Sequence, residues 1–365
     1  MHAPHIFIPG CFAPPTLIYS SSKYQASLLL LESGSQSTKL SCASDGSIHQ
    51  IAVRLAAPPH LRTRPSGASL WHRNHPPGFD AATGVTSKDV VINGATGVFA
   101  RLYVPNLAAA GSDSQRKKLP ILVYFHGGGL VLASAASPTY HRYLNSVASK
   151  ANVLAVSVNY RLAPEHPIPA AYDDSWAALS WAASRDDPWL SEHGDAGRIF
   201  LAGDSGGANI VHNIAIMAGT RDGLRLPPGA LLEEAIIFPP MFGGKEPVDG
   251  EVIHMRESAE KLWSILCPES TEGVDDPWFN PMAPGAPSLQ KLACRRLLVC
   301  SADGDFALPR AVGYYVYQAV KASGWRGTVE WLESKGGEHV FFLNKPECDE
   351  ALQLMDRVVA FLAGN

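Results

Sequence analysis

The sequence predicts an α/β fold in which helices cover both faces of a mainly parallel central sheet. Short apolar runs alternate with helical patterns from Lys118 onward. Several of these runs are apolar at every position, as in strands that are buried on both faces. The chain has 365 residues, 46% hydrophobic and 18% charged, which is an ordinary soluble globular composition. Strand–helix alternation at this spacing implies right-handed crossovers in one parallel sheet.

The predicted strands are short and continuously apolar, and the helices between them are amphipathic or fully apolar. The expected strands cover residues 121–125, 153–158, 199–202, 235–238, 297–300 and 329–332. The expected helices cover residues 170–184, 208–218 and 310–323, and a last one begins near 347 and ends at 362. In such sheets the functional groups gather at the carboxyl ends of the strands.

Two segments depart from this alternation. Residues 241–289 follow a strand without a quick return to the next, and they contain the aromatic and proline-rich run 277–281. We expect this insertion to form a cap at the carboxyl edge of the sheet. Residues 1–78 are rich in proline and serine. We expect an irregular, partly disordered extension there, whose distal part joins the cap, followed by one domain over residues 79–365.

Composition excludes several classes of partner. The net charge is −4, from 30 basic and 34 acidic residues, which favours neither nucleic acid nor an anionic membrane. No apolar stretch approaches the roughly 18 residues of a membrane span. The chain starts without a basic leader, and Pro9, Pro14 and Pro15 interrupt any apolar signal-peptide core. We therefore expect a cytoplasmic protein, and the sequence leaves its oligomeric state open.

The cysteines and histidines give no sign of a metal site. The six cysteines form no C-x-x-C pair, and none lies near histidines at metal-ligand spacing. We expect the thiols to be reduced, and we expect neither a metal nor a cofactor.

A candidate nucleophile lies in residues 203–207, Gly-Asp-Ser-Gly-Gly, which fit the pattern G-x-S-x-G. An apolar run precedes the motif and a helical pattern follows it, so Ser205 is expected at a sharp strand-to-helix turn. The glycines allow the two elements to approach closely, and the helix N-terminus favours negative charge. The alternative is a glycine-rich turn with a serine cap.

Candidate oxyanion donors follow the predicted strand 121–125. The run His126–Gly129 has three glycines with bare backbone N–H groups, and it matches the oxyanion-loop motif of lipases and esterases. We expect Gly127, Gly128 or Gly129, together with Gly206 after the serine, to donate to an oxyanion. His126 is expected to support the loop by hydrogen bonding, and Asp204 has the same expected role.

A serine hydroxyl also needs a base and an acid that orients the base. His339 follows the last predicted strand and leads into the final helix. Two carboxylates, Asp303 and Asp305, follow the strand 297–300, and position alone does not separate them. The chain order serine, acid, histidine is that of α/β-hydrolases, not of chymotrypsin or subtilisin.

With these residues in place, the chain resembles plant carboxylesterases of the hormone-sensitive-lipase-like group of α/β-hydrolases, which also contains the gibberellin receptors. The resemblance covers about residues 84–361 and lies in motifs at 84–90, 126–129, 160–167, 203–209 and 336–341. It implies an α/β-hydrolase fold with catalytic Ser205, Asp305 and His339. It assigns Asp305 rather than Asp303 because alignment from Cys300 places the family's catalytic acid there.

The resemblance implies hydrolysis of small, fairly apolar carboxylic esters without a metal or cofactor. The chain departs from the family in its long, proline-rich start and in Leu130, where the family commonly has phenylalanine. Two other functions remain open. A hormone receptor is one, although the gibberellin receptors lack the catalytic histidine and His339 is present here. A lyase or cyclase that uses the same triad is the other. Fold alone does not separate these functions.

Overall fold

The computed structural model describes residues 74–106, 118–220, 225–249, 251, 253–305, 307–308 and 310–364. Our expectations for residues 1–73, most of the irregular extension, lie outside these ranges. Within these ranges, residues 74–78 form no helix or strand. The backbone N–H of Ser87 in the second strand donates to the Gly78 carbonyl oxygen at 2.8 Å. These residues lie beside the first strands of the sheet.

A nine-stranded sheet crosses the described part of the chain in the order β1-β2-β3-β5-β4-β6-β7-β8-β9. Strands β1 to β3 are antiparallel to their neighbours, whereas β4 to β9 are parallel. The bounds are β1 Phe79–Asp80, β2 Val85–Asn93, β3 Val98–Val104, β4 Leu119–Phe125, β5 Leu154–Asn159, β6 Gly194–Ser205, β7 Leu232–Pro240, β8 Arg296–Ala302 and β9 Thr328–Ser334.

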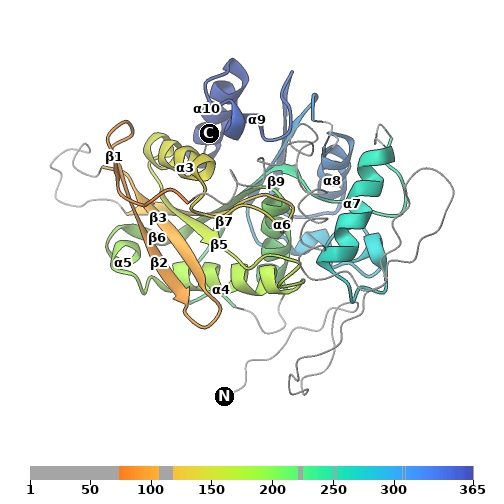
Figure 1. Cartoon of the computed structure of the whole chain (residues 1–365), viewed down its shortest axis with the longest axis horizontal. Coiled ribbons are helices and arrows are strands. Elements are labelled where there is room, and N and C mark those ends of the chain that lie inside the picture. Colours follow the sequence, from red (N-terminus) through yellow and green to blue (C-terminus); the bar gives the residue numbers. More distant parts are fainter. Residues whose placement is uncertain are drawn as a thin grey trace.

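Helices cover both faces of this sheet, with α3 and α10 on one side and α4 on the other (Figure 1). Side chains alternate along each strand, so Ile121 and Val123 join the core with α4 and α6, and Leu122 joins the core with α3 and α10. The helices are α3 Pro138–Ala151, α4 Ala170–Ser184, α5 Pro188–His193, α6 Gly206–Gly219, α7 Ile253–Leu266, α8 Arg310–Ala322, α9 Phe341–Asn344 and α10 Asp349–Leu362, with short 3₁₀ turns η3 Gly273–Asp275 and η4 Leu289–Lys291.

The predicted fold class is confirmed. Each predicted strand lies in or overlaps one of the parallel strands β4 to β9, and the helix predicted over 170–184 coincides with α4. Sequence analysis missed the antiparallel strands β1 to β3 and the helix α3. The α3 helix does carry a buried stripe at helical spacing, which sequence analysis overlooked because polar residues are interspersed with it: Tyr140, Tyr143, Leu144, Val147 and Ala148. None of the described helices is long and apolar enough to cross a membrane.

The 241–289 insertion leaves the sheet after β7 and carries α7 and η3. It packs on α4 through Trp278, whose ring is stacked on Tyr172 with centroids 4.1 Å apart. It is also held by α6, because the Asn209 side chain donates to the carbonyl oxygens of Met241 and Trp278 at 3.0 and 2.8 Å. The insertion therefore begins beside the turn that carries Ser205. Its role as a cap remains a prediction.

Candidate active site

Ser205 lies at the junction of β6 and α6 with strained backbone angles, φ 54° and ψ −117°. This left-handed turn is possible because the neighbouring elements approach at glycines. A Cβ on Gly207 would collide with the carbonyl oxygen of Phe125, and one on Gly203 would lie 2.5 Å from the Gly207 oxygen. The short approach fixes the serine at the carboxyl edge of the sheet, as a nucleophile elbow requires.

Ser205, His339 and Asp305 form one hydrogen-bonded chain. His339 Nε2 lies 3.3 Å from Ser205 Oγ, and His339 Nδ1 lies 2.7 Å from Asp305 Oδ2. A carboxylate only accepts, so Nδ1–H donates to Asp305 and leaves Nε2 free to accept from the serine hydroxyl. Burial lowers the pKa of His339, but Asp305 outweighs it and holds the pKa above its ordinary value of 6.5.

The two competing carboxylates occupy different places. Asp305 Oδ2 bonds to the imidazole, while its Oδ1 accepts the backbone N–H groups of Ala307 and Leu308, both at 2.9 Å. Asp303 Oδ1 instead accepts the N–H of Gly336 at 2.6 Å, at the start of the histidine loop. The structure brings Asp305 to His339 and leaves Asp303 at the turn.

The glycine-rich loop packs directly against the elbow. Gly128 and Gly129 have positive φ of 99° and 60°, and Gly129 Cα lies 3.3 Å from where a Cβ on Gly206 would stand. The Gly127 N–H donates to the Tyr140 hydroxyl at 2.8 Å, so this amide is already occupied. Within the described ranges no acceptor faces the N–H of Gly128 or Gly129, and Gly206 begins α6. The N–H groups of Gly128, Gly129 and Gly206 therefore remain as the candidate oxyanion donors.

His126 and Asp204 are fully buried beside this loop. His126 Nδ1–H donates to the Gly127 oxygen at 2.8 Å, and its ring is stacked on Tyr160 with centroids 4.3 Å apart. Burial lowers the pKa of His126 to about 4, so the ring is neutral near pH 7. Asp204 accepts from the hydroxyls of Tyr124 and Tyr140 at 2.8 and 3.0 Å, and burial raises its pKa to about 6.

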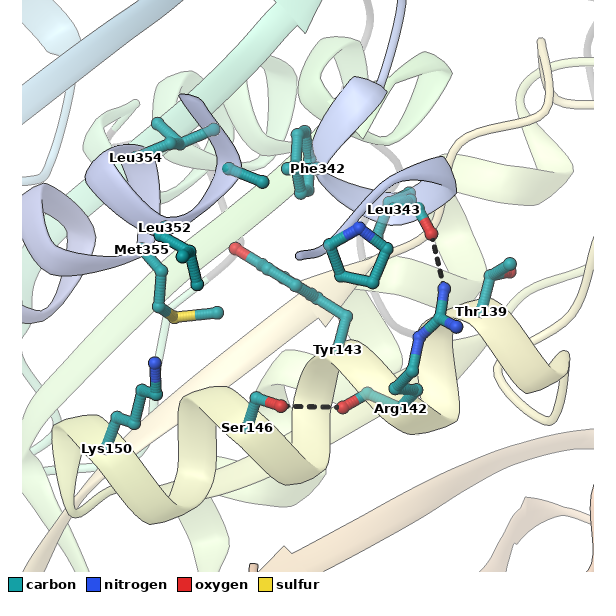
Figure 2. A pocket seen from close by; sticks show the side chains of 12 residues that line it. Thr139, Arg142, Tyr143, Ser146, Lys150, Phe342, Leu343, Leu352, Leu354 and Met355 are labelled. Carbon is teal, nitrogen blue, oxygen red and sulfur yellow. Dashed lines mark hydrogen bonds between the residues drawn. The ribbon is translucent and has the colours of Figure 1, made fainter. Parts of the chain in front are cut away.

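Sequence reasoning missed two residues of α3, Arg142 and Tyr143, that contact the segment after His339. Figure 2 shows the guanidinium of Arg142 pointing to the carbonyl oxygen of Leu343 in α9, and the two atoms are 2.7 Å apart. The ring of Tyr143 lies against Phe342, with centroids 5.1 Å apart. A small cavity of about 60 Å³ lies between α3, α9 and α10. Neither Arg142 nor Tyr143 belongs to a motif, so only a correct prediction of α3 could have indicated their positions.

The described residues contain no cluster of three or more histidine, cysteine, aspartate or glutamate side chains that could hold a metal ion. What the arrangement offers is a strained serine, an imidazole in contact with it, a buried carboxylate and free backbone N–H groups. These are the parts that acyl transfer needs.

Comparisons with known proteins agree with this fold. A family model for the alpha/beta hydrolase fold matches residues 122–343. Tuliposide A-converting enzyme 1 of Tulipa gesneriana is 46% identical, over 77% of this chain and 71% of that protein. The 2-hydroxyisoflavanone dehydratase of Glycyrrhiza echinata is 44% identical over 78% and 87%, and probable carboxylesterase 2 of Arabidopsis thaliana is 40% identical over 79% and 88%.

Among solved structures, an esterase of Pyrobaculum calidifontis is similar with a TM-score of 0.58 and 25% identity, over 87% of this chain and 91% of that one. The resemblance to plant carboxylesterases is thereby confirmed.

The expectation of a cytoplasmic protein is wrong. Three tulip relatives, 44 to 46% identical to this chain, are named chloroplastic or amyloplastic, which points to a plastid. The expectation failed because it tested only for a secretory leader with an apolar core. Plastid transit peptides are instead serine-rich and poor in acidic residues. The fold and the relatives agree, and the chain belongs to the alpha/beta hydrolase fold family.

Proposed function

We propose that this protein is a serine carboxylesterase that hydrolyses small, fairly apolar esters through an acyl-enzyme. Ser205 Oγ attacks the ester carbonyl carbon while His339 Nε2 takes the hydroxyl proton. The tetrahedral oxyanion accepts hydrogen bonds from Gly128, Gly129 and Gly206. As it collapses, the ester C–O bond breaks and His339 returns the proton to the leaving alcohol. Water then attacks the acyl group by the same route and releases the acid.

One observation carries this proposal. Ser205, His339 and Asp305 come from three distant parts of the chain, yet they meet at 3.3 and 2.7 Å in the order that base-activated serine attack requires. A glycine-rich turn with a serine cap would have no reason to bring a paired histidine to the hydroxyl.

The apolar surroundings of the serine support the proposed substrate class. The side chain of Leu130 lies 3.3 Å from where a Cβ on Gly206 would stand. The Met241 N–H donates to the Ser205 carbonyl oxygen at 3.1 Å, and Met241 and Phe242 are buried side chains at the start of the insertion. Apolar acyl or alcohol groups of modest size fit such surroundings better than charged ones.

The test compares the full chain with Ser205→Ala and His339→Ala. The wild type should react with a fluorophosphonate probe and hydrolyse p-nitrophenyl acetate, whereas both variants should lose roughly 10³-fold or more in kcat. Absence of labelling and turnover in a folded wild type would refute the esterase proposal.

A second candidate function is water elimination, and the 44% identical relative named a dehydratase favours it. In that reaction His339 would remove a proton next to a carbonyl while hydroxide leaves the neighbouring carbon as water. A 2-hydroxyisoflavanone serves as the test substrate. Loss of one water in the product, retained in Ser205→Ala but lost in His339→Ala, would favour elimination over ester hydrolysis.

A plastid location is part of the proposal. It is supported by the names of the tulip relatives and by the composition of residues 1–78, which are serine-rich with Glu32 and Asp45 as the acidic residues. The full chain fused at its C-terminus to a fluorescent protein should accumulate in plastids of plant cells. Fluorescence spread through the cytosol would contradict this part.

A further inference from the structure

We propose that Tyr140 is a positioning residue whose hydroxyl holds the oxyanion loop in its catalytic position against the nucleophile elbow. The proposal rests on the esterase function proposed above and assigns part of its machinery to α3. In the described part of the chain no hydrogen bond joins Tyr140 to Ser205 or His339. Tyr140 acts through the backbone of the loop by two hydrogen bonds: the Gly127 N–H donates to the Tyr140 hydroxyl, and this hydroxyl donates to the Asp204 carboxylate.

The direction of each hydrogen bond in this chain is fixed by chemistry. A backbone N–H only donates, so the Tyr140 oxygen accepts from Gly127 at 2.8 Å. The single hydroxyl proton is then free for Asp204 Oδ2, 3.0 Å away. Burial and the nearby Asp204 charge raise the pKa of Tyr140 well above 10, so the hydroxyl keeps this proton. One hydroxyl therefore joins the loop to the residue that precedes the nucleophile.

The hydroxyl lies in a closely packed part of the fold. A Cβ on Gly127 would overlap the Asp204 carboxylate, so the loop and the elbow are already in contact. Tyr140 is 2% exposed and Asp204 is 1% exposed. If the hydroxyl is removed, the Gly127 N–H loses its hydrogen bond at 2.8 Å and keeps only its interaction with the neighbouring Asp204 carboxylate, at the cost of one buried hydrogen bond. The loop then relieves this cost by moving, which displaces the N–H groups of Gly128 and Gly129.

A matched control lies on the other side of the same carboxylate. Tyr124 donates to Asp204 Oδ1 at 2.8 Å and is equally buried, at 1% exposure. Its hydroxyl bonds to Asp204 and not to the loop. Tyr124→Phe and Tyr140→Phe therefore each remove one hydroxyl from Asp204, but only the second removes the hydroxyl that accepts from Gly127.

The experiment measures ester hydrolysis, inhibitor affinity and hydrogen exchange for the full chain and these two variants. Tyr140→Phe should lower kcat by about 10- to 100-fold with little change in KM, somewhat less than the loss of a whole oxyanion donor. The affinity for a trifluoromethyl ketone, whose adduct places an oxyanion in the hole, should fall by the same factor. Tyr124→Phe should lower kcat by no more than about threefold, because only a bond to Asp204 is lost.

Hydrogen exchange tests the positioning without any ester. Peptides covering residues 126–132 should exchange roughly tenfold faster in Tyr140→Phe, as expected when one buried hydrogen bond is lost, and at the wild-type rate in Tyr124→Phe. Equal kcat losses in the two variants, or a loss of melting temperature without a change in kcat, inhibitor affinity or loop exchange, would overturn the proposal.

Two further arms keep the test decisive. If the wild type hydrolyses no ester, the proposed function fails, while the exchange rates still decide whether Tyr140 holds the loop. If Tyr140→Phe does not fold, Asp204→Asn replaces it. Tyr124 and Tyr140 bond to different oxygens of Asp204, and in asparagine one of these becomes an NH2 group that cannot accept, so kcat should fall and loop exchange should rise. Wild-type values of both in Asp204→Asn would overturn the proposal.

Discussion

The site has two sides, and the structure holds them by different means. The oxyanion loop, residues 126–132, is fixed by buried hydrogen bonds from tyrosine hydroxyls and a carboxylate. The histidine loop, residues 335–344, is fixed by the His339–Asp305 pair and by aromatic packing of Phe342. Both sides rest on the same helix, α3. A buried hydrogen bond depends on single atoms, whereas packing depends on area, so the two sides should respond differently to substitution.

The largest effect expected on the histidine side comes from Asp305→Asn. The amide cannot hold the Nδ1–H tautomer or stabilise the imidazolium, so kcat should fall by about 10³- to 10⁴-fold. Asp303→Asn is the control, since the Asp303 side chain bonds only to the Gly336 N–H in the described region and its loss should lower kcat by less than about tenfold. Steady-state kinetics on p-nitrophenyl acetate measure both. Equal losses, or the reverse order, would refute the assignment of the acid.

These two carboxylates also show what sequence can and cannot predict. Ser205, His339 and the pair Asp303 and Asp305 were predictable, because a parallel sheet brings the ends of its strands to one edge. Which of the two acids meets the histidine depends on a turn of three residues, and position alone did not decide it. The positions of the candidate serine, histidine and acids after their strands could be predicted from the sequence. Which acid bonds to the histidine is decided by the local geometry of the turn.

The supporting residues were not predictable for a different reason. Tyr124, Tyr140 and Tyr160 are buried, but each carries a hydroxyl that pairs only across the fold. No period in the sequence marks such a pairing. The oxyanion loop could be predicted from its glycines. The sequence does not show that the Gly127 N–H donates to a tyrosine hydroxyl while the N–H groups of the next two glycines do not.

Packing on the histidine side is tested by Phe342→Ala. Phe342 is 3% exposed and its ring lies 5.1 Å from Tyr143 and 4.7 Å from Phe238. Its truncation should lower the free energy of unfolding by about 3–5 kcal/mol. Denaturant unfolding measures this. Leu352 lines the small cavity beside Phe342 but is 44% exposed. Leu352→Ala should therefore lower the free energy of unfolding by less than about 1 kcal/mol. Similar costs for both would show that α9 is not packed as described.

The pH profile tests whether charge connects the two sides. His339 acts as a base only when neutral, so kcat/KM should rise with pH through its pKa, which Asp305 holds above 6.5. The Asp204 charge on the oxyanion side raises the same pKa by a smaller amount. Asp204→Asn should therefore move the midpoint of the rise to lower pH, without abolishing it. A midpoint that does not move would mean that the two sides are electrostatically independent.

The smallest effect is expected from Arg142→Gln, although Arg142 resembles Tyr140 in joining α3 to a catalytic loop by one hydrogen bond. Arg142 is an exposed residue, so water reaches one side of its part-buried bond to the Leu343 oxygen, which is drawn in Figure 2. Water replaces a bond there, so the variant should lose no more than about 1 kcal/mol of stability and about threefold in kcat. Lys150→Gln, on the same face of α3 and at the same cavity, is the matched control for the loss of charge. Melting temperature and kcat of both variants measure the difference. If Arg142→Gln lowered kcat as far as Tyr140→Phe, burial would not be what separates the two sides, and the histidine loop would depend on its surface bond rather than on the packing of Phe342.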